Sequence, residues 1–446
     1  MRYEKYISVP DAIWFDVVPD SWRALKMRGV FSERNTKVSD KDYPALSVGK
    51  MGVVPQLDTA VKTDNGDNRK LICKGDFAIN SRSDRKGSSG ISQYDGSASL
   101  IITVLKPHRS LNGRFYHYLL RGHYFAEEFY RNGHGLVSDL WTTKWDEMSN
   151  IYIPVPPREE QDQIVRYLDW QVSKINKLIH GYQWKIKLLE ERRQTIIDQT
   201  SLEGVDGVKL IDSGTHWVKQ IPENWKMVYS KKLFAERKDK AFLNDEQLTA
   251  SQKHGVISQK EFMEKVGRRV TVVTKGGDIL KHVGKGDFII SMRSFQGGLE
   301  YSYVEGKISS AYVMLIPRKG LVYDEYFKWF LKSTPYIKAL QGTADLVRDG
   351  QALRYANFAK VPLPQVPIDE QKRIADYIEQ ETAKIDRAIP VLEKEIELLK
   401  EYRTRLISDV VTGQMDVRNV EVPEYTPEED IAEEAPEEQE VEMDAD

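Results

Sequence analysis

The most regular hydrophobic pattern in the chain begins at Arg158 and continues to about Thr200 without a proline. Apolar residues recur there at steps of mostly three or four, which places them on one face of an amphipathic helix. A second stretch, after Pro367, repeats this spacing. The two stripes consist of Ile164, Leu168, Val172, Ile175, Ile179, Tyr182, Ile186, Leu189 and Ile196, and of Ile374, Ile378, Ile385, Ile389, Leu392, Ile396, Leu399 and Leu406.

Each stripe is longer than one small domain can cover, since forty helical residues span about 60 Å. We therefore predict that the two helices pack against each other as an antiparallel coiled coil. Two separate helices, each covering its own domain, remain the alternative. Pro390 interrupts the second stripe opposite His180–Gly181 of the first. Because proline removes a backbone hydrogen bond, we expect a bend or short break there.

The segments before the helices also occur twice, about 210 residues apart. "WFDVVPDSW" at Trp14–Trp22 matches "WVKQIPENW" at Trp217–Trp225, and "KGDF" occurs at Lys74–Phe77 and Lys285–Phe288. Short β-rich runs alternate with glycine turns and one aromatic helix in each copy. This order predicts mixed α/β globular domains in tandem, each followed by a long α-helix, as a pseudo-two-fold internal repeat. We expect the four tryptophans to pack at the domain entrance.

The repeat and its proline-rich breakers divide the chain into five predicted segments. They are a first globular domain over 1–157, a first spacer helix and linker over 158–207, a second globular domain over 208–367, a second spacer helix over 368–418, and an acidic tail over 419–446.

Charge is distributed unevenly along the chain. The residues from Glu421 to Asp446 include thirteen Asp or Glu and no Lys or Arg, so the net charge of −3 conceals a body of +10 over residues 1–420. Such a tail is expected to be disordered, and a basic body suits either ordinary solvated surface or nucleic-acid binding. One cysteine, the absence of a secretion-signal pattern and the absence of a long apolar run predict a cytoplasmic protein.

The sequence offers few signs of catalysis. It contains no phosphate-binding loop of the G-x-x-x-x-G-K-[ST] type and no H-E-x-x-H zinc motif. The Asn/Asp-Pro-Pro-aromatic tetrapeptide of amino-methyltransferases is also missing. The repeated positions are Trp, Pro, Gly and apolar residues with a few polar loop residues. We therefore predict a binding scaffold and no enzyme.

Together these features resemble the specificity subunit of type I restriction–modification systems. The resemblance covers roughly residues 5–418 and is carried by the linker Val208–Trp225, "KGDF", "VPPREEQ" at Val155–Gln161 and "LISDVVTGQMDV" at Leu406–Val417. It implies two target-recognition domains, each reading one half of a bipartite DNA target, with the paired helices setting the spacing. It also implies two adenine methyltransferase subunits and restriction/motor subunits as partners, which use S-adenosylmethionine, ATP and Mg²⁺, and no cofactor on this subunit.

DNA readers need phosphate-neutralising charge beside side chains that reach base edges. Two loops after strands, Asn80–Gly90 and the matching "SMRSFQGG" at Ser291–Gly298, have this composition, as do Thr249–Phe262 and the matched frames Gly135–Asp139 and Asp345–Asp349. The candidate DNA-binding residues are Arg82, Arg85, Lys86 and Ser138 in the first copy, and Gln252, Lys253, His254, Gln259, Arg293, Ser294, Gln296 and Arg348 in the second. Ordinary solvated loops are the alternative.

The repeated pair Glu160–Gln161 and Glu370–Gln371 lies in the first turn of each predicted helix, where a carboxylate suits the positive helix end. Methyltransferase docking is the rival role. Two other functions remain open for the whole chain: a self-sufficient DNA methyltransferase or nuclease fusion, and a coiled-coil adaptor that binds no DNA.

Overall fold

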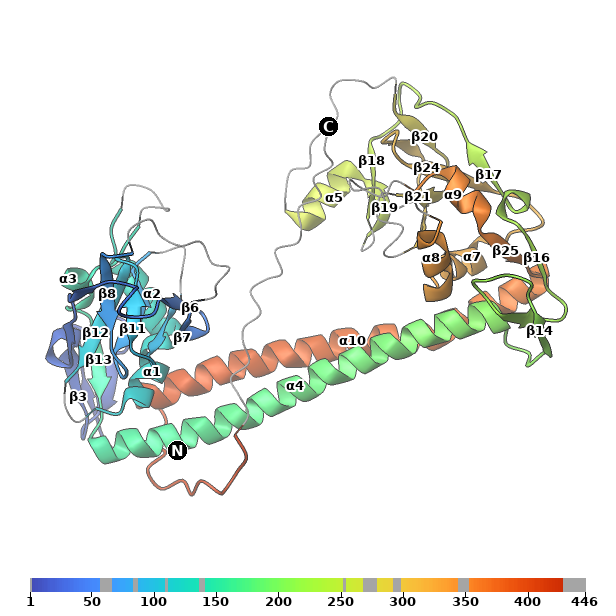
Figure 1. The fold of residues 1–446 in the computed structure, drawn as a ribbon. Coiled ribbons are helices and arrows are strands. Elements are labelled where there is room, and N and C mark those ends of the chain that lie inside the picture. Colours follow the sequence, from blue (N-terminus) through green and yellow to red (C-terminus); the bar gives the residue numbers. More distant parts are fainter. Residues whose placement is uncertain are drawn as a thin grey trace. The chain divides into compact units, whose positions relative to one another are not determined.

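The computed structural model of the chain describes residues 2–56, 66–82, 87–108, 111–135, 141–251, 254–267, 279–291, 298–343 and 353–427 (Figure 1). These residues form two compact units. The first unit contains the described residues up to 183 together with those from 393 to 427, and the second contains residues 184 to 392. Each unit thus takes part of both long helices, so the five-segment division remains a prediction.

The first unit holds short strands, three short helices and one 3-10 turn. They are β1 (Tyr6–Ser8), β2 (Val17–Pro19), β3 (Arg23–Lys26), η1 (Met27–Gly29), β4 (Phe31–Glu33), β5 (Lys37–Val38), β6 (Leu46–Gly49), β7 (Gly52–Pro55), β8 (Arg69–Ile72), β9 (Phe77–Asn80), β10 (Ser89–Ile91), β11 (Gly96–Ala98), β12 (Ile102–Pro107), α1 (Gly113–Arg121), α2 (His123–Arg131), α3 (Trp145–Met148) and β13 (Tyr152–Val155).

The second unit follows the same plan. Its elements are β14 (Leu210–Asp212), β15 (Gln220–Pro222), β16 (Lys226–Tyr229), η4 (Ser230–Lys232), β17 (Phe234–Arg237), β18 (Leu248–Ser251), β19 (Gly255–Ser258), α5 (Gln259–Val266), β20 (Lys281–Val283), β21 (Phe288–Ile290), β22 (Glu300–Tyr301), β23 (Gly306–Ile308), β24 (Val313–Pro317), α7 (Asp324–Phe330), α8 (Thr334–Gln341), α9 (Tyr355–Lys360) and β25 (Pro362–Gln365).

Both units build their main sheet in the same order. In the first unit the order is β10-β9-β12-β4, and in the second it is β22-β21-β24-β17, with antiparallel pairing throughout. The flanking pairs also correspond, β13 with β3 and β25 with β16. The central strands β9 and β21 are fully buried. The mixed α/β character predicted from the sequence is therefore confirmed.

The two long helices are α4 (Arg158–Glu203), with 46 residues, and α10 (Ile368–Val411), with 44 residues. In the second unit the start of α10 and the end of α4 enter the hydrophobic core, through Ile374, Ile378, Ile197 and Leu202. Among the described residues, no helix has the length and apolar character needed to cross a membrane.

A bend or short break was predicted at Pro390, and the structure shows no break. Proline lies inside α10, which continues as a helix on both sides, and α4 is likewise continuous through His180–Gly181. Pro390 is exposed, so water can reach the carbonyl group of Asp386 that loses its amide partner. The lost hydrogen bond is therefore tolerated within the helix.

The repeated KGDF motif forms a buried ion pair in each unit. Arg34 donates to both oxygens of Asp76, at 2.6 and 3.0 Å, and Arg237 does the same for Asp287, at 2.5 and 2.9 Å. Each aspartate also accepts an amide hydrogen bond three residues upstream. The glycine before each aspartate has a positive φ, +89° at Gly75 and +95° at Gly286, which favours glycine. The motif therefore fixes the entry to the central strand.

The predicted packing of the four tryptophans is also confirmed. Trp22 and Trp225 are each only 2% exposed. Trp14 donates from its indole nitrogen to the carbonyl of Tyr152 at 2.8 Å, and Trp217 donates to that of Pro362 at 3.1 Å. Each hydrogen bond ties the segment that enters a domain to the strand that leaves it, β13 or β25.

Candidate nucleic-acid interface

Arg82 lies just beyond the central strand of the first unit. β9 ends at Asn80, whose side-chain oxygen accepts the amide of Arg82 at 3.0 Å, and the backbone of Arg82 pairs with Thr142. Ser81 accepts a second hydrogen bond from the amide of Thr143 at 3.0 Å. These bonds hold the backbone while the side chain of Arg82 stays exposed. A fixed backbone with a free guanidinium suits contact with a phosphate or a base edge.

His254 lies between β19 and the end of β18 in the second unit. Its amide donates to the Ser251 hydroxyl at 3.4 Å, and its ring stands edge-on to Phe262 with centroids 6.1 Å apart. The ring is half-buried. His254 therefore lies at a hairpin end with its side chain partly exposed.

Gln259 is a weaker candidate than the sequence indicated. It is the first residue of α5, directly after the N-cap Ser258, and its amide donates to the carbonyl of Gln247 at 2.9 Å. Its side chain is only 8% exposed. A side chain buried under a helix start reaches a base edge only if the hairpin rearranges, so its burial argues against the predicted contact.

The other predicted DNA-binding residues lie outside the residues that the structure describes. They are Arg85, Lys86, Ser138, Gln252, Lys253, Arg293, Ser294, Gln296 and Arg348. Their roles stay predictions. Arg82, which is described, is placed next to two of them in sequence, at the end of a strand that the Arg34–Asp76 pair anchors.

The Glu-Gln pairs at the helix starts are buried anchors. Gln161 donates to the carbonyl of Pro156 and accepts the amide of Asn112, both at 2.9 Å. Gln371 donates to Leu321 and Val366 and accepts the amide of Tyr323. Both glutamines are 2% exposed or less. Each one joins the start of a long helix to the segment before the aromatic helix of its domain.

The glutamates of these pairs are buried as well. Glu160 accepts the hydroxyl of Tyr3, and Glu370 accepts the side-chain amide of Asn224 at 2.8 Å. Burial and the bond to Glu160 raise the pKa of Tyr3, which therefore stays a neutral donor. With these contacts made inside each unit, the pairs serve the domain and leave little surface for a partner. A repeated Glu-Gln after proline was the only sequence signal for this role.

Sequence reasoning missed a group of basic side chains in the second unit. Lys231, Lys232 and Lys238 stand close together in "KKLFAERKDK", and they line an open groove with Arg318, which follows β24. The local density of lysines was the available signal, but it has no counterpart in the first copy. Within the described ranges, no three His, Cys, Asp or Glu side chains are grouped so that they could hold a metal ion.

Known proteins resemble this chain along most of its length. A protein of Methanocaldococcus jannaschii, assigned as the specificity subunit of the type I restriction enzyme MjaX, is 22% identical over 430 residues, covering 90% of this chain and 95% of that protein. The MjaVIII specificity subunit of the same organism is 22% identical over 289 residues, covering 61% of this chain and 64% of its own length. No protein-family model matches the chain.

A solved structure shares the fold. It comes from work on the complex assembly and conformational transition of a type I R-M system, and it matches with a TM-score of 0.65 at 14% identity, covering 89% of this chain and 99% of that one. The resemblance that the motifs indicated is therefore confirmed, and the chain is similar to a type I restriction enzyme specificity subunit over 90% of its length.

Proposed function

We propose that this chain is the DNA sequence-recognition subunit of a type I restriction–modification complex. The observation that carries the proposal is the match to a specificity subunit over 95% of that protein's length. The repeated sheet order gives the chain two similar domains, which suits a target of two halves. The basic body over residues 1–420 suits a polyanionic ligand.

In this proposal each globular domain reads one half of a bipartite target. Arg82 and the predicted residues Arg85 and Lys86, in the loop after β9, contact the first half. The corresponding loop after β21 and the β18–β19 hairpin contact the second half. Because the two domains share a framework but differ in their loop residues, the two half-sites of the DNA target can differ in sequence. The subunit itself supplies recognition and no catalysis, and it acts in the cytoplasm, where its DNA is.

The long helices are proposed to form an antiparallel coiled coil around a pseudo-two-fold axis. Contacts within each unit support this order. In the first unit Arg403 donates to Asn176 at 2.9 Å, while Gln163, nearer the start of α4, donates to Val417 and Val420, beyond the end of α10. In the second unit Arg193 pairs with Asp386 at 2.8 Å. Later positions on α4 thus meet earlier positions on α10, as antiparallel helices require, and the pair sets the distance between the half-sites.

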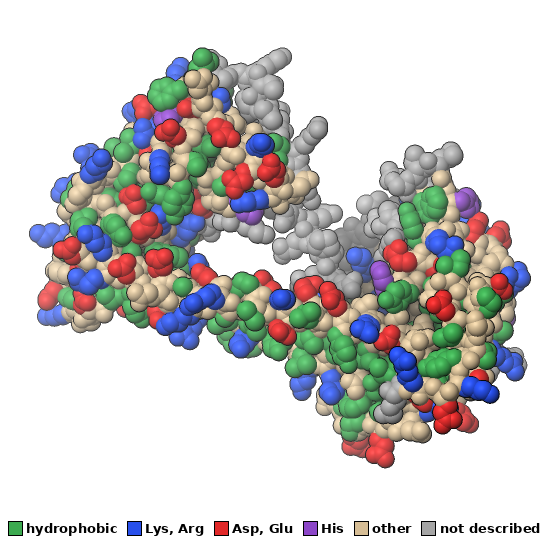
Figure 2. All heavy atoms as spheres, turned by 180° about the vertical axis from the view of Figure 1, so that it is seen from behind, with side chains coloured by type: hydrophobic (Ala, Val, Ile, Leu, Met, Phe, Trp, Pro, Cys, Tyr) green, Lys and Arg blue, Asp and Glu red, His purple; other side chains and the backbone are tan. Residues whose placement is uncertain are grey.

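The same helices are proposed to dock the two methyltransferase subunits. Hydrophobic side chains reach the surface along them (Figure 2). In the first unit the side chain of Tyr402 is 54% exposed and that of Leu398 is 47% exposed. Tyr167 lies near Tyr402, and burial together with Tyr402 raises the pKa of Tyr167. In the second unit Tyr377 is 46% exposed and Leu188 45% exposed. Tyr377 and Leu398 stand 210 positions after Tyr167 and Leu188, so the same tyrosine and leucine positions recur in the two copies, with Tyr167 half-buried.

A surface that occurs once in each unit suits two copies of the same partner, since each copy can make the same contacts. The partner subunits then bring S-adenosylmethionine for methylation, and the restriction/motor subunits use ATP and Mg²⁺. This subunit binds none of these cofactors itself in the proposal.

Domain exchange tests the proposal. Residues 20–155 are replaced by the matching domain of a relative, and the protein is assembled with its methyltransferase partner. Mapping of N6-methyladenine in genomic DNA is expected to show one altered half-site and one unchanged half-site. Change in both halves would contradict independent reading. Methyl transfer by the purified chain alone would instead support a self-sufficient enzyme.

A further inference from the structure

The second unit has a basic groove on elements other than its predicted reading loops. Its walls are η4 and β17 on one side and α9 on the other, and the turn after β24 closes one end. The groove has a volume of about 630 Å³, and its polar lining consists of Lys231, Lys232, Glu236, Lys238, Arg318 and Tyr355. In Figure 1, β17 and α9 lie toward one side of this unit, and β18, β19 and α5 toward the other.

The backbone around this groove is held by buried hydrogen bonds. The Ser230 hydroxyl donates to the carbonyl of Phe358 at 2.8 Å, which fixes η4 against α9. The amide of Arg318 donates to the carbonyl of Leu233 at 2.8 Å, and Phe234 pairs with Pro317 across β17 and β24. The cationic side chains therefore project from a rigid frame, which lowers the entropy lost when they bind an anion.

Most of the positive charge in the groove is uncompensated. Glu236 is the carboxylate among the lining residues, and it lies 3.9 Å from the ammonium of Lys238. Lys231, Lys232 and Arg318 form no ion pair within 4.0 Å in the described part of the chain. Burial and Glu236 raise the pKa of Tyr355, and Arg318 opposes them, which places both charges beside that hydroxyl.

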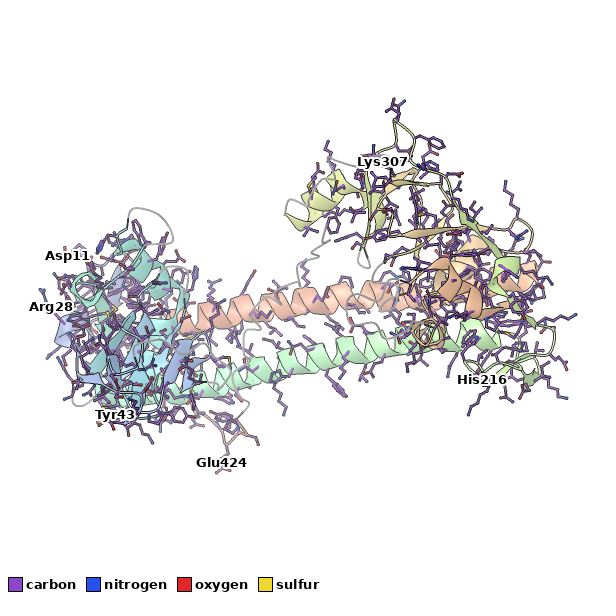
Figure 3. The ribbon with its side chains drawn as sticks, turned by 45° about the horizontal axis from the view of Figure 1, so that its top comes forward. Asp11, Arg28, Tyr43, His216, Lys307 and Glu424 are labelled. Atoms are coloured by element: carbon purple, nitrogen blue, oxygen red, sulfur yellow. The ribbon has the colours of Figure 1, made fainter. Side chains whose placement is uncertain are left out.

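The first unit carries less positive charge at the corresponding positions. Arg28 and Gly29 of η1 correspond to Lys231 and Lys232 of η4, and His108 after β12 corresponds to Arg318 after β24. Arg28, labelled in Figure 3, donates to Asn150 at 3.1 Å, and the ring of His108 lies 3.2 Å from the carbonyl of Gly29. The shared frame thus does not require a lysine or arginine at the positions of Lys232 and Arg318, and the cluster of three is found in the second unit.

We propose that this groove binds the sugar–phosphate backbone of DNA outside the base pairs that the reading loops contact. Three cations that form no ion pair with another described residue suit a repeating polyanion, since each can meet a separate phosphate. The ammonium of Lys231 lies 5.6 Å from the ring of Tyr229, which leaves its charge uncompensated. The inference rests on the proposed function, because the loops of the same domain hold DNA in that proposal. The groove then contributes affinity without sequence preference on the side of the second half-site.

The test compares two triple variants of the full-length protein. Lys231→Ala/Lys232→Ala/Arg318→Ala removes three of the four groove cations and keeps Lys238, which is close to Glu236. Lys209→Ala/Lys219→Ala/Lys338→Ala removes three exposed cations elsewhere in the same unit and matches the change in net charge. Binding of a fluorescent duplex is measured by anisotropy at several salt concentrations, with circular dichroism to verify folding. A third measurement maps the methylated sites made with the partner subunit.

Wild-type protein is expected to lose affinity linearly in log salt, which tests the proposed function. The groove variant is expected to bind roughly tenfold or more weakly, with a salt slope smaller by about 2 to 3, since each phosphate contact contributes about 0.9. Its methylated sequence should stay the same. If the groove variant has the same DNA affinity and salt slope as the control variant, the groove does not bind DNA, while the proposed function in DNA recognition still stands. The same result is expected if the groove binds an acidic protein. Wild-type protein without salt-dependent DNA binding would overturn both.

Discussion

The main sheets of the two units have one order, and the contacts that frame them recur residue by residue. Arg34–Asp76 corresponds to Arg237–Asp287, and Gln161 corresponds to Gln371. The surfaces differ. The second unit has Lys231 and Lys232 in η4 where the first has Arg28 and Gly29 in η1. The comparison teaches that buried polar contacts define the domain, while exposed positions are free to specify a ligand.

The largest effect is expected when the long helices are lengthened, because this changes the spacing of the two units without altering either unit. Matched insertions of four helix-forming residues after Gln183 in α4 and after Leu392 in α10 lengthen both helices by about 6 Å and rotate them by only about 40° beyond a full turn. This length is close to two base-pair steps of about 3.4 Å. We expect both half-sites to remain and their spacing to grow by one or two base pairs. Methylation mapping with the partner subunit measures this spacing.

A four-residue insertion after Glu424 is the control, because Glu424 lies beyond α10 (Figure 3) and should leave the spacing unchanged. An active helix variant with the original spacing would show that the helices join the units without setting the distance between half-sites.

Breaking the buried ion pair should destabilise each unit separately. Asp76→Ala leaves Arg34, whose side chain is only 19% exposed, without its carboxylate, whereas in Asp287→Ala Arg237 keeps its ion pair with Asp239 at 2.9 Å. The expected loss in the free energy of unfolding is about 3 kcal/mol for Asp76→Ala, because an unpaired buried charge is costly, and it is smaller for Asp287→Ala. Hydrogen exchange followed by mass spectrometry should show the loss around β9 for the first variant and around β21 for the second. Asp67→Ala is the control, since that side chain is 72% exposed.

Gln161 and Gln371 allow a second comparison of the two units, because the two side chains make different numbers of hydrogen bonds. Gln371 makes three and Gln161 makes two. Gln371→Ala is expected to cost about 2 to 3 kcal/mol and Gln161→Ala about 1 kcal/mol less, since each unsatisfied buried group adds a penalty. Urea unfolding of both variants, with the exposed Gln183→Ala as control, gives the difference. Equal losses would mean that the extra bond to Leu321 contributes nothing.

The smallest expected effect concerns the acidic tail. Removing residues 428–446 deletes eleven Asp or Glu and keeps the carbonyls of Val417 and Val420 that accept from Gln163. Non-specific DNA affinity should rise a few-fold at low salt, since the carboxylates compete with phosphate. The gain should shrink as salt screens charges beyond about 8–10 Å. Anisotropy titrations measure it, and an altered methylated sequence would show that the tail takes part in recognition.

Sequence patterns correctly predicted those secondary-structure elements that depend on neighbouring residues in the chain. The apolar stripes after Pro157 and Pro367 predicted the long helices, and α4 and α10 begin at Arg158 and Ile368. The expected break at Pro390 was wrong because exposure of the residue lets water replace the missing bond. The burial of Gln259 was not foreseen. Its polar side chain suited a reading loop, but packing of the first turn of α5 buries it.

The sequence by itself determined the repeat, the helical stripes, the charge of body and tail, and the family resemblance, because periodicity and motif order are properties of the chain. Only the tertiary structure showed what the repeated motifs contact. The aspartate of KGDF meets an arginine 42 residues earlier in the first unit, and the glutamine of each Glu-Gln pair bonds residues about 50 positions away. The groove cations likewise come from η4, β17 and the turn after β24. Sequence spacing does not encode such long-range contacts, since folding alone brings these segments together.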